Sequence, residues 1–502
     1  MCDIILYETV IITMLYRPLE TNRLQDPINE KILQYGFKIQ PFNENNPSSN
    51  FGWAYPTYFN RINLPKQGFK LHISATIINS SDIFDKIIPY LISKNIAFKI
   101  AASNLCLRKL NSNHFSYSQV GKFITIYPLS TEHALNLAED IHERLKEFHG
   151  PKIPSDLQYQ ENSVVHYRYG CFYPDKKGIL VSPSGEEFED QRDPQKPIPD
   201  WIKNPFPIQN NKEDKESKLL ADRYLLLKVI SQRSKGGVFY ALDLYDHVLK
   251  NPNPQTKQVI LKEGRKHSEV EENGIDAYAR IQWEYKILKR IQPLEIAPKP
   301  IELHEFNSGA LLTMDFCGGK TLTEILLSQH PDQNQTLDYL RQTAQHIKNL
   351  HKNRIYFFDL SPSNILISEQ NKVKLIDFEF CVTDNGLEPL NWSAGTPGFR
   401  PNTSKFVKEI KTIEELAIRR DIYALAMLSL AVTQPKWYRD MIDKKYNSIP
   451  DWGMSDYINL LPKPIQNILH NTRPEDFRFD SVNQIIQEIE QLQLVKINET
   501  NL

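Results

Sequence analysis

The stretch from Phe357 to Phe380 reads FFDLSPSNILISEQNKVKLIDFEF. It contains a carboxylate at Asp359, an amide at Asn364 and a second carboxylate at Asp377. Two apolar runs between them, ILI and VKLI, flank a polar turn and predict two short strands. In phosphoryl transfer, Asp359 would accept the proton of an attacking hydroxyl, while Asn364 and Asp377 would hold Mg²⁺. We therefore expect a nucleotide site in this stretch.

The order D-L-x-P-x-N followed by I-D-F resembles the catalytic and metal-binding loops of protein kinases. Upstream residues extend this resemblance. The predicted strand VILK ends in Lys262, and the predicted helix ARIQWEYKILKRI contains Glu284, which could hold this lysine against the nucleotide phosphates. The predicted turn at residues 231–238 resembles a phosphate-covering hairpin, and residues 311–317 resemble a hinge. The resemblance implies ATP, or another nucleoside triphosphate, bound with Mg²⁺ by Lys262, Glu284, Gly236, Gly237 and Met314.

The sequence departs from the kinase pattern in four places. Phe357-Phe358 replaces the His-Arg pair before the base, Ser361 replaces the lysine two residues after it, and Glu379 replaces the glycine of D-F-G. The first two glycines of the phosphate loop are also missing. With Ser361 in place of a lysine, the sequence does not say how the γ-phosphate is held. A pseudokinase that only binds a peptide stays open as an alternative.

The first half contains a second polar pattern. Residues 69–74 read FKLHIS, and the alternation predicts a half-buried strand with Lys70 and His72 on its polar face. Two further predicted strands, AFKI and KFITIY, carry Lys99 and Lys122. Cationic groups gathered on one face would suit a phosphate dianion, although lysines at strand edges and single histidines more often have structural roles.

The K-x-H pair and the later lysine resemble the phosphothreonine lyases of bacterial pathogens. The wider pattern K-L-H-I-S-A, F-K, G-K-F-I-T-I-Y-P and H-Y-R-Y-G, with DWIKNPF further on, resembles the lyase domain of class III lanthipeptide synthetases. This resemblance implies β-elimination, with Lys99 as the base and His72 as the acid. Lys70, Arg168 and Lys122 would neutralise the phosphate, and a structural role for Arg168 and Lys122 stays open. An unperturbed lysine has a pKa near ~10.4, so Lys99 would need burial and neighbouring positive charge.

The chain of 502 residues is too long for one core. We predict an α+β protein with a phosphothreonine-lyase-like domain at residues 1–181, a Pro-rich linker at 182–219 that partly docks on its neighbours, and a bilobal kinase-like domain. Its N-lobe would span residues 220–318 and its C-lobe residues 319–502. The apolar run at residues 10–15 is too short to span a bilayer and predicts an early strand or helix.

The composition of the chain limits the classes of partner that we expect. Sixty basic and sixty-one acidic residues leave a net charge of −1, which predicts no nucleic-acid or membrane partner. Five scattered cysteines without a C-x-x-C pair predict neither disulfides nor zinc, and a cytoplasmic location fits them. We expect a two-step Ser/Thr dehydratase acting on a ribosomal precursor peptide with a leader, and a separate cyclase, because the zinc-binding cyclase domain of class III synthetases is not encoded here. An enzyme pair acting on signalling proteins and a non-enzymatic peptide-binding scaffold are the alternatives.

Overall fold

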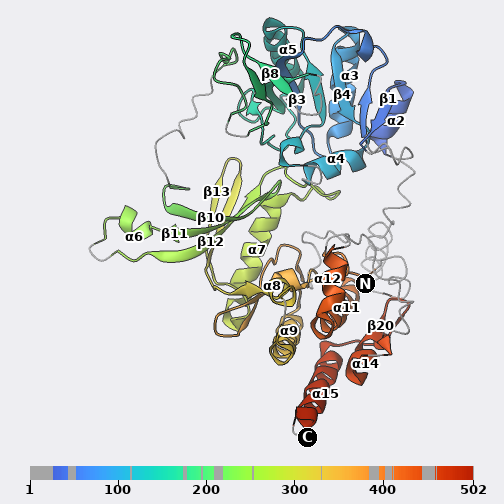
Figure 1. The fold of residues 1–502 in the computed structure, drawn as a ribbon, viewed down its shortest axis with the longest axis vertical. Helices are drawn as coiled ribbons and strands as arrows, with labels where there is room; N and C mark the ends of the chain where they lie inside the picture. The colour runs from blue at the N-terminus through green and yellow to red at the C-terminus, as the bar shows by residue number, and fades with distance from the viewer. Residues whose placement is uncertain are drawn as a thin grey trace, which may run out of the picture.

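The computed structural model describes three bodies in chain order: a first domain, a smaller β-rich lobe and a helical lobe (Figure 1). The N-terminal domain lies at one end, the C-terminus lies at the other, and the small lobe lies between (Figure 1). The described residues are 26–42, 52–112, 116–172, 178–193, 196–207, 219–251, 254–328, 331–383, 395–401, 410, 412–443, 458–459 and 461–500. The predicted element at residues 10–15 lies outside them.

The first domain is built on a seven-stranded antiparallel sheet. Its strands, in spatial order, are β1 (Lys38–Pro41), β2 (Gly52–Tyr55), β4 (Ala97–Ala101), β5 (Ile124–Tyr127), β3 (Gln67–Ile73), β7 (Val165–Cys171) and β6 (Leu157–Gln158). One face carries Leu71, Phe98 and Ile126, which belong to the apolar core. The other face carries Lys70, His72 and Lys99, because side chains alternate along a strand.

The described part of this domain also contains the α-helices α2 (Pro27–Gln34), α3 (Ser80–Ser93), α4 (Asn104–Asn111) and α5 (Thr131–Leu145) and the short 3-10 helices η2 (Phe59–Arg61) and η3 (Tyr117–Gln119). Local sequence fixes where they begin. Ser130 caps α5, because its hydroxyl accepts a hydrogen bond from the His133 amide at 3.1 Å. Ser103 caps α4 in the same way through the Cys106 amide at 3.0 Å. Helix α4 lies at the end of the domain nearest the small lobe (Figure 1).

Part of the segment predicted as a linker packs on the first domain. It contains β9 (Glu187–Glu189), which pairs with β8 (Ile179–Val181). The Tyr169 amide donates a hydrogen bond to the Pro197 carbonyl at 3.0 Å. Phe206 is 2% exposed and stacks on Tyr167 with ring centroids 3.9 Å apart. Residues up to Phe206 therefore contribute to the core of the first domain.

The small lobe is a five-stranded antiparallel sheet covered by α7 (Ala277–Ile291). Its strands, in spatial order, are β10 (Tyr224–Arg233), β11 (Gly236–Asp243), β12 (Lys257–Arg265), β14 (Gly309–Asp315) and β13 (Pro300–Phe306). The short helices α6 (Tyr245–Val248) and η4 (Gln292–Leu294) complete it. Asp276 caps α7 by accepting a hydrogen bond from the Ala279 amide at 2.9 Å.

The large lobe is mainly helical. Its helices are α8 (Leu322–Leu326), α9 (Gln333–Lys352), α11 (Ile413–Thr433), α12 (Pro435–Asp443), α14 (Lys463–Asn471) and α15 (Val482–Thr500). Its short strands are β15 (Lys320–Thr321), β16 (Ile355–Tyr356), β17 (Ile365–Ile367), β18 (Val373–Leu375), β19 (Val382–Thr383), β20 (Thr472–Arg473) and β21 (Asp476–Phe477). The two strands predicted in the opening stretch are β17 and β18, which pair with each other. Their hairpin places Asn364 before one strand and Asp377 after the other.

Three local predictions were wrong. The turn predicted at residues 231–238 is only Ser234-Lys235, because the strands pair up to Arg233 and Gly236. Lys122 precedes β5, because Phe123 bonds back to Gly121, whose φ of +81° breaks the strand. Strand β3 is buried on both faces from residue 69 to residue 73 rather than half-buried. The last error arises because a loop containing Asp156 covers the polar face.

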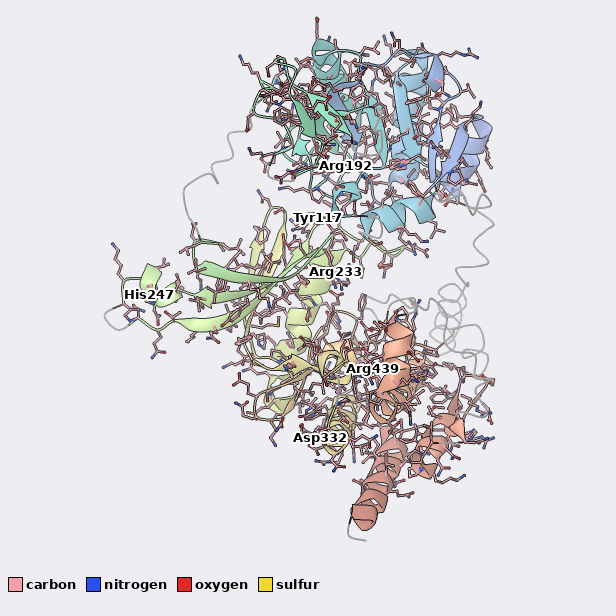
Figure 2. The ribbon with its side chains drawn as sticks, in the orientation of Figure 1. Tyr117, Arg192, Arg233, His247, Asp332 and Arg439 are labelled. Atoms are coloured by element: carbon pink, nitrogen blue, oxygen red, sulfur yellow. The ribbon has the colours of Figure 1, made fainter. Side chains whose placement is uncertain are left out.

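The first domain touches the small lobe through polar groups. The Tyr117 hydroxyl accepts hydrogen bonds from Gln232 at 3.1 Å and from Arg265 at 2.9 Å. Arg108 on α4 pairs with Glu272 at 2.8 Å. Tyr117 lies at this junction in Figure 2. Across the described ranges, no helix combines the length and apolar character needed to cross a bilayer.

The packing of Phe206 generates a stability prediction. Replacing this ring with alanine would leave a cavity beside Tyr167, and such a change costs about 3–5 kcal/mol. We expect Phe206→Ala to lower the thermal unfolding midpoint of the first domain in calorimetry. Phe188→Ala is the control, because Phe188 in the same segment is 43% exposed and should change the midpoint little. Equal midpoints for both variants would contradict the assignment of this segment to the domain.

Candidate active sites

The first candidate site is a row of side chains across four strands of the N-terminal sheet. The strand register pairs Lys99 with Thr125, Thr125 with His72, and His72 with His166. Because paired strands lie about 4.8 Å apart, Lys99 and His72 are separated by two strand spacings on one face. Lys70, one step along β3, pairs in register with Arg168. The structure thus brings together the predicted residues of this half.

Burial and mutual repulsion lower the pKa of the lysines in this row. Lys99 has a pKa well below its usual value because it is buried and because Lys70 and Lys122 add positive charge nearby. Burial and Arg168 lower the pKa of Lys70 to about 7. The Lys99 ammonium group also lies 4.2 Å from the centroid of the Trp53 ring. Lys99 is half-buried by its exposed surface and has cations beside it, so its surroundings suit a base, and that role stays a prediction.

A buried carboxylate, Asp156, contacts His72 and Lys122. Asp156 contacts the His72 ring at Nδ1, and its second oxygen lies 3.3 Å from the Lys122 ammonium nitrogen. Lys122 also donates to the Ser155 hydroxyl at 3.0 Å. Although burial opposes it, His72 and Lys122 keep the pKa of Asp156 well below its usual value. Burial lowers the pKa of His72 to about 3, so its ring is neutral.

Sequence reasoning missed three groups that complete this cluster. Asp156 lies in a loop without periodicity, so only its position next to the buried face identifies it. Asp190, in the predicted linker, pairs with Arg168. Arg192, two residues further on, adds positive charge near Lys99. It lies within the first domain in Figure 2. No local pattern in this polar segment marks these residues as part of a site.

Three buried polar atoms in this region have no hydrogen-bond partner among the described residues. They are the Ser74 hydroxyl, the His166 Nε2 and the Arg168 Nε. The Ser74 hydroxyl and the Arg168 Nε can donate, so beside several cations they indicate room for an additional acceptor, whereas the His166 Nε2 is itself an acceptor because Nδ1 faces the Val164 carbonyl. An anion with several oxygens fits the donors and charges present.

The second candidate site is formed by the opening stretch of the sequence. The Asp359 carboxylate accepts hydrogen bonds from the Thr396 amide at 2.8 Å and from its hydroxyl at 3.1 Å. The Asn364 amide donates to the Asp359 carbonyl at 2.8 Å. Burial and Asp377 raise the pKa of Asp359 to about 6, closer to neutrality than an ordinary carboxylate. The predicted base is therefore adjacent to the loop at residues 395–398.

Asp421 of α11 fixes the backbone of the catalytic stretch. Its two carboxylate oxygens accept hydrogen bonds from the Phe357 amide at 2.8 Å and the Phe358 amide at 2.7 Å. Phe358 has a φ of +71°, an unfavourable conformation for a bulky residue. The Arg420 guanidinium lies 3.7 Å from the centre of the Phe358 ring. These contacts hold Asp359 although the His-Arg pair of kinases is replaced.

Lys262 is surrounded by carboxylates. Its ammonium nitrogen lies 2.6 Å from Glu284, as predicted, contacts Asp377, and lies 3.6 Å from Glu379. Although burial opposes charge, these carboxylates raise the pKa of Lys262 well above its usual value. Oxygens of Glu284, Asp377 and Glu379 lie within 4.8 Å of one another. Hard oxygen donors gathered in this way fit Mg²⁺, with Asp377 and Asn364 the predicted ligands.

The remaining predicted nucleotide residues lie along the small lobe. Met314 is buried on β14, where it pairs in register with Ile260. Gly236 follows the hairpin turn with a φ of +145°, and a Cβ there would lie 2.1 Å from the Glu263 carbonyl oxygen. The Gly237 amide donates to the Glu263 carboxylate at 3.0 Å. Gly236 thus permits close backbone approach to β12, whereas a Cβ at Gly237 would meet the side chains of Phe239 and Gln232.

Comparisons with known proteins agree with the division of the chain into a first domain and a two-lobed second domain. Residues 46–218 match the family described as RamC, N-terminal domain, and residues 247–490 match the protein kinase domain. The chain carries a RamC N-terminal domain followed by a protein kinase domain. The predicted fold class and the resemblance to a lyase-plus-kinase pair are confirmed at this level. A protein kinase domain in general uses ATP with Mg²⁺.

Two curated relatives are similar to this chain over different lengths. The chain is 25% identical over 396 residues to a probable SapB synthase of Streptomyces coelicolor, covering 74% of this chain and 40% of that protein. It is 25% identical over 235 residues to the hormonally up-regulated neu tumor-associated kinase of Mus musculus, covering 44% of this chain and 32% of the kinase. The chain therefore spans well under half the length of these relatives.

The buried Asp156 generates a pH-dependent stability prediction. Asp156→Asn would leave the Lys122 charge without its partner, which costs about 3–5 kcal/mol for a buried pair. Burial already lowers the pKa of Lys122 to about 8, so this lysine can lose its proton at high pH. We expect the loss of stability to be larger at pH 6.5 than at pH 9.5, measured by urea unfolding of the first domain. Asp85→Asn, at an ion pair whose carboxylate is 63% exposed, should cost under about 1 kcal/mol at both pH values.

Proposed function

We propose that this chain is a Ser/Thr dehydratase that works in two steps on a ribosomal precursor peptide carrying a leader, in lanthipeptide-type maturation. The kinase domain phosphorylates a Ser or Thr side chain, and the N-terminal domain eliminates the phosphate to leave a dehydroamino acid. The observation that carries the proposal is the row formed by Lys99, His72 and Lys70 on one buried sheet face, in the same chain as a kinase site.

In the first step, the substrate hydroxyl attacks the γ-phosphorus of ATP as the bond to the β-phosphate oxygen breaks. Asp359 receives the hydroxyl proton, and its raised pKa suits this role. Bound Mg²⁺ would neutralise the phosphate oxygens. Asn364 and Asp377 supply oxygen ligands, and Glu284 holds Lys262 at 2.6 Å, where it can face the phosphates.

In the second step, Lys99 takes the proton from Cα of the phosphorylated residue. The released electron pair forms the Cα–Cβ double bond, and the Cβ–O bond breaks with its electrons leaving on phosphate. His72 is neutral without substrate, so the arriving phosphate dianion must raise its pKa before it can donate a proton. Asp156 at Nδ1 favours the protonated ring and fixes its orientation. Lys70, Lys122 and Arg168 offset the phosphate charge.

The proposal is tested by mass spectrometry with ATP, Mg²⁺ and a Ser- and Cys-containing peptide encoded beside this gene. The unmodified chain should add about 80 Da and then lose phosphoric acid, leaving the peptide about 18 Da lighter than at the start. We expect Lys99→Ala to accumulate the phosphopeptide and Asp359→Asn to leave the peptide unmodified. The Lys99→Ala variant is the matched control for kinase folding, because its phosphorylation step should be retained.

The outcomes separate the competing functions. No ATP-dependent mass change would overturn the dehydratase and favour a peptide-binding scaffold. Elimination from a phosphorylated signalling protein, but not from the peptide, would favour an enzyme pair directed at signalling proteins. If the unmodified chain phosphorylates the peptide but the phosphopeptide persists, the kinase step would stand and the lyase step would be overturned.

The charge of Lys70 generates a pH prediction for elimination alone. Lys99 acts only when neutral, so the rate should rise as the pH passes its pKa. Lys70 lowers that pKa, and Lys70→Met should therefore move the acidic limb of the rate profile to higher pH. The assay uses a synthetic phosphoserine peptide without ATP. Lys86→Met, at an exposed ion pair with Glu147, should leave the limb in place, and an unmoved limb in Lys70→Met would contradict the role of Lys99.

A further inference from the structure

The tip of the β10–β11 hairpin carries a lysine that points into the nucleotide site. Ser234 and Lys235 form the two-residue turn between Arg233 and Gly236. Two hydrogen bonds within the small lobe hold the tip: the Arg265 amide donates to the Lys235 carbonyl at 2.9 Å, and the Ser234 hydroxyl bonds to Glu269. The Lys235 side chain extends toward the loop of the large lobe that follows β18.

There the Lys235 ammonium nitrogen lies 2.5 Å from the Glu379 carboxylate. The second oxygen of the same carboxylate lies 3.6 Å from Lys262. Glu379 is 3% exposed and stands where kinases have the glycine of D-F-G. Although burial opposes it, Lys235 and Lys262 keep the pKa of this carboxylate below its usual value, so it is charged. Two lysines, one from the hairpin turn and one from β12, thus share one buried anion.

The contact between Lys235 and Glu379 lies where we expect the phosphates of the nucleotide to bind. Lys262 contacts Asp377 and lies beside Glu284, and these carboxylates form one oxygen cluster with Glu379. A lysine whose charge reaches this cluster can also reach a phosphate held by Lys262 and the metal. A flexible four-carbon side chain can exchange one oxygen partner for another without backbone movement.

The C-lobe lacks such a cation at the expected place. Ser361 stands two residues after Asp359, and its hydroxyl is bonded to Ser363 at 2.8 Å. Ser361 is fully buried and carries no charge. The positive charge for the terminal phosphate must therefore come from elsewhere, and Lys235 is a cation directed at the site from the lobe above.

We propose that Lys235 binds the terminal phosphates of ATP and that Glu379 occupies this lysine when no nucleotide is bound. The inference rests on the proposed kinase step and deepens it. During transfer, negative charge moves onto the β–γ bridging oxygen as its bond to the γ-phosphorus breaks. A lysine at the hairpin tip would stabilise that charge.

Binding of Mg·ATP, Mg·ADP and adenosine to the full chain, measured by isothermal titration calorimetry, tests this directly. Lys235→Met should weaken Mg·ATP about 10- to 100-fold, as expected for loss of a charged hydrogen bond, and leave adenosine unchanged. Lys235→Arg should restore most of the affinity. Arg233→Met is the matched control, because Arg233 lies two residues earlier on the same hairpin and is exposed (Figure 2).

A second variant tests the exchange between partners. If Glu379 competes with phosphate for Lys235, Glu379→Gln should strengthen Mg·ATP binding, and this gain should disappear in the double variant with Lys235→Met. Equal affinity of Lys235→Met and the unmodified chain for Mg·ATP would overturn the inference alone. Tighter Mg·ATP binding by Lys235→Met would also overturn it, because the ion pair would then only obstruct the site. An unmodified chain that binds no Mg·ATP would overturn the kinase step as well.

Discussion

The first domain encloses more positive than negative charge on one face of its sheet. Lys70, Lys99, Lys122 and Arg168 lie there, against the carboxylates of Asp156 and Asp190. Removing a charge from water costs several kcal/mol unless a partner compensates it. Burial and the neighbouring cations lower the pKa of Lys99, which reduces this cost, and an anion with several oxygens would supply the missing partner for the others. The same imbalance would therefore favour both the lysine base and the phosphate site that we propose for this face.

The kinase site has the opposite imbalance. Glu284, Asp377 and Glu379 gather around two lysines, with Asp359 close by. An excess of carboxylates attracts Mg²⁺, and Mg²⁺ in turn accommodates the phosphates of ATP. In the two-step reaction that we propose, the kinase site would take the metal-bound triphosphate donor, and the first domain would take the phosphate ester. The charge of each site, rather than its fold, makes this distinction.

The predictability of the site residues follows from how each one is positioned. Lys70 and His72 could be placed on one face from the sequence because side chains alternate along a strand, whereas Lys99, on another strand, could be added from the family resemblance. The Lys262–Glu284 pair could be placed because a strand and a helix of known order carry them. Asp156 and Arg192 could not, since they lie in loops whose approach to the sheet depends on tertiary packing. The roles proposed for all of these residues stay predictions.

The hairpin over the nucleotide site is held from two directions. On its outer side, Tyr117 of the first domain accepts hydrogen bonds from Gln232 of β10 and Arg265 of β12. On its inner side, Lys235 contacts Glu379 of the large lobe. The two contacts involve different groups: the proposed exchange of Glu379 for phosphate needs only rotation of the lysine side chain, whereas the Tyr117 hydrogen bonds come from the side chains of Gln232 and Arg265. The proposed exchange therefore requires no change in the contact between the first domain and the small lobe.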